Sequence, residues 1–115
     1  MNNLSQEHCA SINSTSKRLD EKEAGQMLNE LSGWMLINKD NEPRLEKTFK
    51  FDDFQQALDF TVRVGQLANE EDHHPALLTE WGKVTVDWWT HKIKGLHRND
   101  FIMAAKTDHV SVKVK

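Results

Sequence analysis

The stretch RLEKTFKFDDFQQALDFTVRVGQLANEE, residues 44–71, changes the period of its apolar residues halfway along. In its first part apolar and polar residues alternate, so that Leu45, Phe49 and Phe51 share one face of a strand. After Asp52 the apolar residues recur at helical intervals instead. The stretch therefore predicts a strand that is followed directly by a long amphipathic helix.

The helix predicted for residues 52–71 begins with Asp52 and Gln55 at the spacing of a capping box. Its apolar residues fall on two neighbouring stripes. The stripes are Phe54, Leu58 and Val62 on one side, and Ala57, Phe60, Val64 and Leu67 on the other. An apolar arc of this width exceeds what one sheet face requires, so we expect part of the helix to pack against a second subunit.

Upstream of the strand, residues 1–19 are polar and lack apolar periodicity, which predicts a flexible N-terminal arm. Asp20 and Glu23 have capping-box spacing and predict a first helix that ends near Gly33. The short apolar run at residues 34–37 then forms the first strand of a hairpin with a loose turn at residues 38–43.

Downstream of the long helix, two strands are predicted at residues 77–81 and 84–90, joined by a type II′ turn at Gly82-Lys83. Trp88 shares its face with core valines and is expected to be buried, while Trp89 and His91 face the other way. A last helix begins near His97 or Asn99.

The elements follow in the order α-β-β-α-β-β-α, which is typical of an α+β fold with three helices packed on a four-stranded antiparallel sheet. We expect one domain over residues 20–115.

Composition excludes several classes of protein. The chain has 115 residues, 37% hydrophobic and 29% charged, with a formal net charge of −3 and no basic stripe. These values argue against direct nucleic-acid binding. No apolar run is long enough for a membrane helix, and no secretory signal is recognisable. Cys9 is the only cysteine, so we expect no disulfide framework and a cytoplasmic location.

Three histidines are the candidates for chemistry: the pair His73-His74, which precedes Pro75 at the end of the long helix, and His91 at a strand end. Imidazole both donates and accepts protons near neutral pH, so these groups could form an acid-base site. Two other interpretations stay open. The pair could be a solvated helix end, or the histidines could bind metal, although adjacent helical residues do not share a face.

These residues carry a resemblance to a known family. Glu71-Asp72-His73-His74-Pro75, Trp81, Trp89-Thr90-His91, Gly95-Leu96 and Asp100 occur in an order and spacing that resemble the pterin-4a-carbinolamine dehydratase family. The similarity extends over residues 20–108 and is strongest to the bacterial branch at residues 78–86. Asn69 departs from the pattern, because many members have an acidic residue there. Glu70 or Glu71 could take that role, or the first histidine could be oriented differently.

The resemblance implies a set of site residues. His73, His74 and His91 match the catalytic histidines of the family. Seven further residues match positions that line or adjoin the pterin: Pro75, Thr90, Lys92, Ile93, Asp72, Asp100 and Trp34. Asp100 has a second interpretation as a cap of the last helix, since it follows His97 by three residues.

The resemblance also implies an activity and an assembly. We expect a dehydratase that removes water from 4a-hydroxytetrahydropterin and so supports cofactor recycling for aromatic amino-acid hydroxylases. It would use no metal and no cofactor, with the pterin as substrate, and form a homodimer or homotetramer. The alternative is a protein-binding module, because some animal members are dimerisation partners of a transcription factor.

Overall fold

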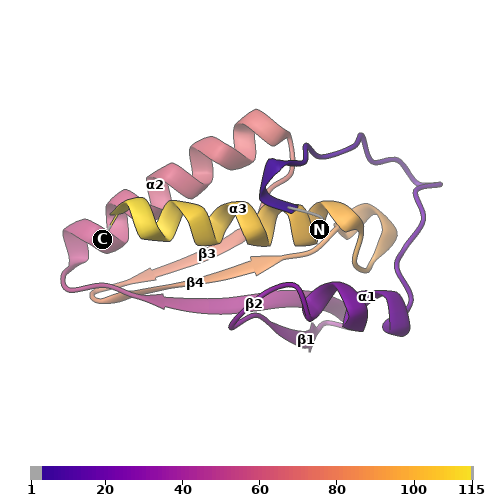
Figure 1. The fold of residues 1–115 in the computed structure, drawn as a ribbon, viewed down its shortest axis with the longest axis horizontal. Coiled ribbons are helices and arrows are strands. Elements are labelled where there is room, and N and C mark those ends of the chain that lie inside the picture. Colours follow the sequence, from indigo (N-terminus) through magenta and orange to yellow (C-terminus); the bar gives the residue numbers. More distant parts are fainter. Residues whose placement is uncertain (1–3, 115) are drawn as a thin grey trace.

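The computed structural model describes residues 4–114 of the chain. This part contains three α-helices and four strands (Figure 1). The predicted order and the α+β class are confirmed. The elements are α1 (Glu21–Leu28), β1 (Met35–Lys39), β2 (Glu42–Lys50), α2 (Phe54–Glu71), β3 (Ala76–Glu80), β4 (Lys83–Trp88) and α3 (Arg98–Val114). Two short 3-10 helices, η1 (Leu4–Gln6) and η2 (His91–Ile93), were not predicted.

The four strands form one antiparallel sheet in the order β1-β2-β4-β3. The two hairpins therefore meet at their second strands, with Leu45 of β2 opposite Trp88 of β4. Helices α2 and α3 lie side by side on one face of this sheet (Figure 1). The loops at the end of the sheet where β4 stops and α3 begins are where the candidate site forms.

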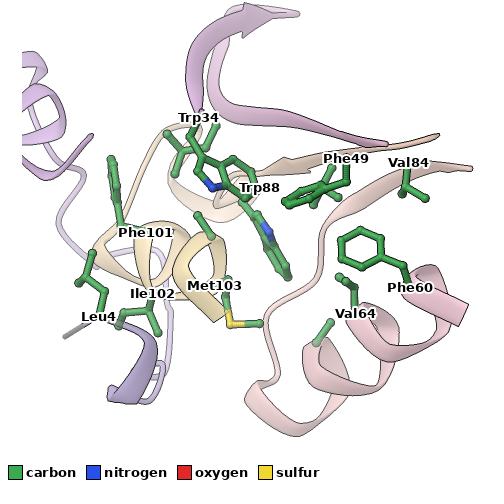
Figure 2. Close-up of a cluster of buried hydrophobic side chains, with 14 of the residues drawn as sticks. Leu4, Trp34, Phe49, Phe60, Val64, Val84, Trp88, Phe101, Ile102 and Met103 are labelled. Carbon is green, nitrogen blue, oxygen red and sulfur yellow. The ribbon is translucent and has the colours of Figure 1, made fainter. Parts of the chain in front are cut away.

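The core lies between the sheet and helices α2 and α3 (Figure 2). Its centre is aromatic: Phe60 of α2 packs against Phe49 of β2 and against Phe51, which follows β2, with ring centroids 4.8 and 5.0 Å apart. Trp88 is fully buried, as its alternation with Val84 and Val86 predicts, and its indole N–H donates to the hydroxyl of Thr107. Burying aromatic area on this scale provides much of the drive to fold.

Two helix boundaries differ in detail from the sequence prediction. The capping box of Asp20 and Glu23 is confirmed, but α1 ends at Leu28, well before Gly33. Helix α2 is capped by Asp53, not by Asp52, because the Asp53 carboxylate accepts the backbone N–H of Gln56. The sequence repeats both the aspartate and the glutamine, so the pattern fits either register.

Both hairpin turns were predicted imprecisely. The β1–β2 turn is tight, since its two residues Asp40 and Asn41 both have positive φ, the conformation of a type I′ turn. In the second hairpin Glu80 pairs with Lys83, so Trp81 and Gly82 form the loop. Gly82 has no positive φ, and the predicted type II′ turn is therefore wrong.

The two apolar stripes of α2 have different environments. Ala57, Phe60 and Val64 are 0% exposed and face the core. The other stripe is exposed to solvent. Its members are Phe54, Leu58 and Val62, at 46%, 39% and 50% exposure. The second-subunit contact predicted for this helix stays a prediction, but the stripe that would make it is uncovered.

The N-terminal segment packs along α3. Leu4 is 4% exposed, and Glu7 accepts two hydrogen bonds from the guanidinium of Arg98, at 2.8 and 2.6 Å. The flexibility predicted for residues 1–19 stays a prediction, and residues 1–3 lie outside the described part. Within residues 4–114, no helix is both long and apolar enough to cross a bilayer.

Candidate active site

A cavity of about 650 Å³ lies at the end of α2, lined by residues 8–12, 70–74 and 89–92. The fold thus brings together three segments that are far apart in the sequence. Six of the ten site residues that the resemblance implies line it: Asp72, His73, His74, Thr90, His91 and Lys92. The volume lies within the range of small-molecule sites.

His73 is positioned by the way α2 ends. Asp72 adopts the left-handed conformation (φ 52°, ψ 43°), which aspartate tolerates better than most residues. The backbone N–H of His73 then donates to the carbonyl of Ala68, closing the helix as in a Schellman motif. The imidazole is only 7% exposed and stacks on the indole of Trp88, with ring centroids 6.0 Å apart.

Asp100 lies behind His73 and is fully buried. Its Oδ1 is 2.6 Å from His73 Nε2, while Oδ2 accepts from the hydroxyl of Thr90 and the backbone N–H of His97. The bond from His97 is the helix cap that the spacing predicts. Asp100 therefore caps α3 and also orients His73 from outside the cavity.

The hydrogen bond to Asp100 fixes the tautomer of His73. An ionised carboxylate only accepts hydrogen bonds, so Nε2 of His73 donates to it. In the neutral imidazole Nδ1 is then the nitrogen with a free lone pair.

His74 and His91 are exposed, and each has one ring nitrogen near an oxygen acceptor. His74 Nε2 lies 3.1 Å from the side-chain oxygen of Asn69. His91 Nδ1 lies 2.9 Å from Oε1 of Glu42, at the start of β2. His91 begins η2 and does not lie in a strand, because β4 ends at Trp88. As for His73, the second ring nitrogen is left to accept a proton when the ring is neutral.

Asn69, where the sequence departs from the family pattern, thus contacts the second histidine of the pair and not the first. Glu70 and Glu71, the two acidic residues considered in its place, both line the cavity. Glu71 binds the N-terminal segment, accepting the backbone N–H of Cys9.

Trp89 forms a further part of the wall, and Arg44 stacks on its ring. The guanidinium carbon of Arg44 lies 3.6 Å from its ring centroid, a cation–π contact. Arg44 also pairs with Asp87 at 3.5 Å. A hydrogen bond to Asp87, followed by burial, raises the pKa of the Glu46 carboxyl.

Besides Asp100, three residues that the resemblance implicates do not line the cavity. Trp34 is buried in the core, where its ring meets Phe49 edge-on and its N–H donates to Asp108. Pro75 and Ile93 follow the lining segments and are half-buried. The structure therefore does not bring these three to the cavity surface.

The N-terminal wall has unusual electrostatics. Burial, followed by the nearby carboxylate of Glu71, raises the pKa of the Cys9 thiol to about 12. For Glu71, burial raises the pKa, but its hydrogen bonds with Cys9 and His8, together with Lys106, outweigh that effect and lower the pKa overall. At neutral pH this wall holds a neutral thiol beside a carboxylate.

Metal binding was one of the open interpretations of the histidines. Among residues 4–114, no three His, Cys, Asp or Glu side chains are grouped so that they could hold a metal ion. The protein's independence of metal stays a prediction.

Sequence reasoning missed most of the N-terminal wall and the partners of the histidines. Residues 8–12 lack any periodic pattern, so nothing in the sequence placed them at the site. Trp89 could have been found, because alternation along the strand predicted for residues 84–90 places it on the face opposite to Trp88, together with His91.

Comparisons with known proteins agree on one family. The sequence profile described as "Pterin 4 alpha carbinolamine dehydratase" matches residues 17–110. A Gloeobacter violaceus protein, provisionally named pterin-4-alpha-carbinolamine dehydratase 1, is 47% identical over 112 residues, covering 97% of both chains. A Marinobacter nauticus protein of similar provisional name is 49% identical over 110 residues, covering 96% of this chain and 99% of its own.

Solved structures share the fold. A Brucella melitensis protein described as a transcriptional coactivator/pterin dehydratase superposes with a TM-score of 0.75 at 32% identity, covering 83% of this chain and 99% of its own. A pterin dehydratase-like protein, described as a RuBisCO assembly factor in the alpha-carboxysome, has a TM-score of 0.59. It is 22% identical and covers 69% of this chain and 89% of its own, so it supports the fold alone.

Proposed function

This chain belongs to the pterin-4-alpha-carbinolamine dehydratase family, and from that premise we propose that it removes water from a 4a-hydroxytetrahydropterin to give the quinonoid dihydropterin. One observation carries the proposal: three histidines line one cavity, two from the segment that follows α2 and one from η2. Each has one ring nitrogen near an oxygen acceptor. Such pairing leaves the other nitrogen available for proton transfer.

The reaction needs two proton transfers. The hydroxyl on C4a must receive a proton to leave as water, and N5 must lose a proton as the C4a–N5 double bond forms. An acid and a base held on a rigid frame supply both steps. We propose that His73 and His91 make these transfers and that His74 positions the substrate.

The buried position of His73 suits a proton-transfer role. Its ring is held by Asp100 on one edge and by Trp88 on one face, so little reorganisation accompanies the reaction. His91 reaches the cavity from η2, whereas His73 reaches it from the end of α2. A flat pterin ring could then meet one imidazole from each of these two elements.

The test is steady-state kinetics on carbinolamine generated freshly in the assay. His73→Ala and His91→Ala should each lower kcat by ~10²–10⁴-fold, the usual effect of losing an acid or base. The double variant should be little worse than the worse single variant. His74→Ala should raise KM more than it lowers kcat.

His109 offers a matched control, because it is exposed on α3 and does not line the cavity. His109→Ala should keep full activity. Near-wild-type turnover in both His73→Ala and His91→Ala would overturn the assignment of roles.

The class of product also suggests which enzymes act before and after this chain. Aromatic amino-acid hydroxylases release a 4a-hydroxylated pterin, and a separate reductase must return the quinonoid product to the reduced cofactor. We propose that this chain acts between those two enzymes. Adding it to a hydroxylase assay in which dehydration limits turnover should raise the rate.

A second candidate function is protein binding, and the exposed stripe of α2 favours it. Phe54, Leu58 and Val62 form an uncovered apolar row on one helix. Such rows commonly mark interaction sites. We propose that the row packs against a second copy of this chain in a homodimer or homotetramer, with a different protein as the alternative occupant.

A further inference from the structure

Residues 8–12 line the same cavity as the histidines, yet they precede the part of the chain that matches the family profile, which starts at residue 17. The match to the family profile therefore assigns these residues no role. The segment joins the two other lining segments: near its start it contacts Glu71, and at its end Ile12 accepts a hydrogen bond from Lys92.

The contact with Glu71 holds the start of the segment. One carboxylate oxygen accepts the backbone N–H of Cys9 at 2.8 Å, and the other lies 2.8 Å from Nδ1 of His8. This carboxylate is mostly buried, with a side-chain exposure of 10%. Charge-assisted bonds of this length are among the stronger ones.

Asn99 holds the middle of the segment. Its side-chain oxygen accepts the backbone N–H of Ala10 at 2.9 Å, and its amide donates to the carbonyl of Ala10 at 2.8 Å. The Asn99 side-chain amide thus bonds both the backbone N–H and the carbonyl of Ala10, as the backbone of a neighbouring β-strand would. Asn99 is 1% exposed and does not line the cavity, so its contribution to the wall acts through Ala10.

We propose that residues 8–12 are part of the pterin-binding surface, and that Glu71 and Asn99 are positioning residues that hold this wall against the ring. The proposal rests on the proposed function. Small-molecule sites usually cover 70–90% of a ligand's surface. Residues 8–12 would bury part of the pterin surface that residues 70–74 and 89–92 would otherwise have to bury alone.

Cys9 provides a direct test, because it is the only cysteine in the chain and it lies in this wall. Alkylation by iodoacetamide at pH 9 can be followed by mass spectrometry, with and without biopterin, an oxidised pterin that cannot be dehydrated. Saturating biopterin should slow the reaction about tenfold or more. Equal rates, with biopterin binding verified by its fluorescence, would overturn the proposal.

The second test loosens the wall from outside the cavity. Asn99→Ala should raise KM for the carbinolamine and Kd for biopterin about tenfold, the effect of uncovering on the order of 50 Å² of ring surface. Its kcat should stay within about threefold of wild type, because the histidines are unchanged. A purely structural role would instead lower the active fraction and leave KM unaltered.

Thr15→Ala is the matched control, since Thr15 is exposed in the same N-terminal region, bonds with Asn13 and does not line the cavity. Its KM and Kd should equal those of wild type. Should Asn99→Ala fail to fold, the Cys9 experiment on the unmodified chain still decides. Absence of any pterin binding by the wild-type chain would overturn the proposed function and this inference together. Binding without protection of Cys9 would overturn the inference alone.

Discussion

Replacing Asp100 by asparagine tests whether one buried carboxylate both orients His73 and stabilises the fold. Asp100 accepts from three donors, two of which converge on Oδ2 while His73 alone meets Oδ1. The asparagine amide has a single acceptor oxygen. It satisfies most donors when that oxygen faces Thr90 and His97, which turns its NH₂ group toward His73.

The cost to stability follows from this geometry. The variant replaces three charge-assisted hydrogen bonds by bonds to a neutral amide, in a site that is 0% exposed. Hydrogen bonds to charged groups contribute about 1.5–3 kcal/mol and neutral ones about 0.5–1.5 kcal/mol, so a loss of roughly 3 kcal/mol is expected. An unfolding entropy of about 2.1 cal/mol/K per residue gives roughly 240 cal/mol/K for a chain of this length. Tm should therefore fall by about 12 °C.

Activity should fall as well, for a separate reason. An NH₂ group facing Nε2 favours the tautomer of His73 that carries its proton on Nδ1, so the free lone pair moves to the wrong nitrogen. A loss of ~10²–10⁴-fold in kcat is expected. Both quantities are measured on one preparation, by thermal denaturation and by the dehydration assay below the Tm of the variant.

Asp53→Asn is the control, because Asp53 is an exposed helix cap and asparagine caps a helix about equally well. Its Tm and kcat should match wild type. An Asp100→Asn protein with a Tm within 2 °C of wild type and full turnover would refute the reasoning about both the tautomer and the buried donors.

Three further predictions concern assembly, metal and pH. Val62→Lys places a charge on the exposed stripe of α2 and should reduce the mass seen by light scattering to the 13.3 kDa monomer, whereas a monomeric wild type would contradict the predicted interface. Activity should survive exhaustive chelation, and loss of rate that zinc restores would count against proton-transfer catalysis without metal. Because burial raises the pKa of Cys9 from 9.0 to about 12, the neutral thiol stabilises the fold below pH 9, and that contribution is lost as pH rises from 9 to 12. Cys9→Ala should flatten this alkaline loss in urea denaturation, and identical slopes in both proteins would rule it out.

The periodic segments could be read directly from the sequence. The alternation at Leu45, Phe49 and Phe51 and the helical spacing around Phe60 each follow from burial of one face, which local pattern records. The sequence also placed the three histidines at element ends, where cavities form. Family resemblance then assigned them a chemistry that spacing alone left open.

The exact positions of the helix cap and of the hairpin loop could not be predicted from the sequence, because neighbouring residues suit the same position equally well. Asp52 and Asp53 could each cap α2, and the loop of the second hairpin shifted by one residue to Trp81 and Gly82. A shift of one residue in a turn depends on contacts with the neighbouring strands. In the second hairpin, the carbonyl of Gly82 accepts a hydrogen bond from the backbone N–H of Phe51, which follows β2.

By itself, then, the sequence determined the α+β class and the order of the elements, and it singled out three histidines that line one cavity. Only the tertiary structure decided which distant groups meet them. Asp100 reaches His73, Glu42 reaches His91, and the aperiodic residues 8–12 close the cavity. Asp100 and His73 are 27 positions apart in the sequence, and Glu42 and His91 are 49 positions apart. Each contact depends on the geometry of a single hydrogen bond. Hydrophobic periodicity encodes which face of an element is buried, but it carries no record of which polar group lies across a cavity.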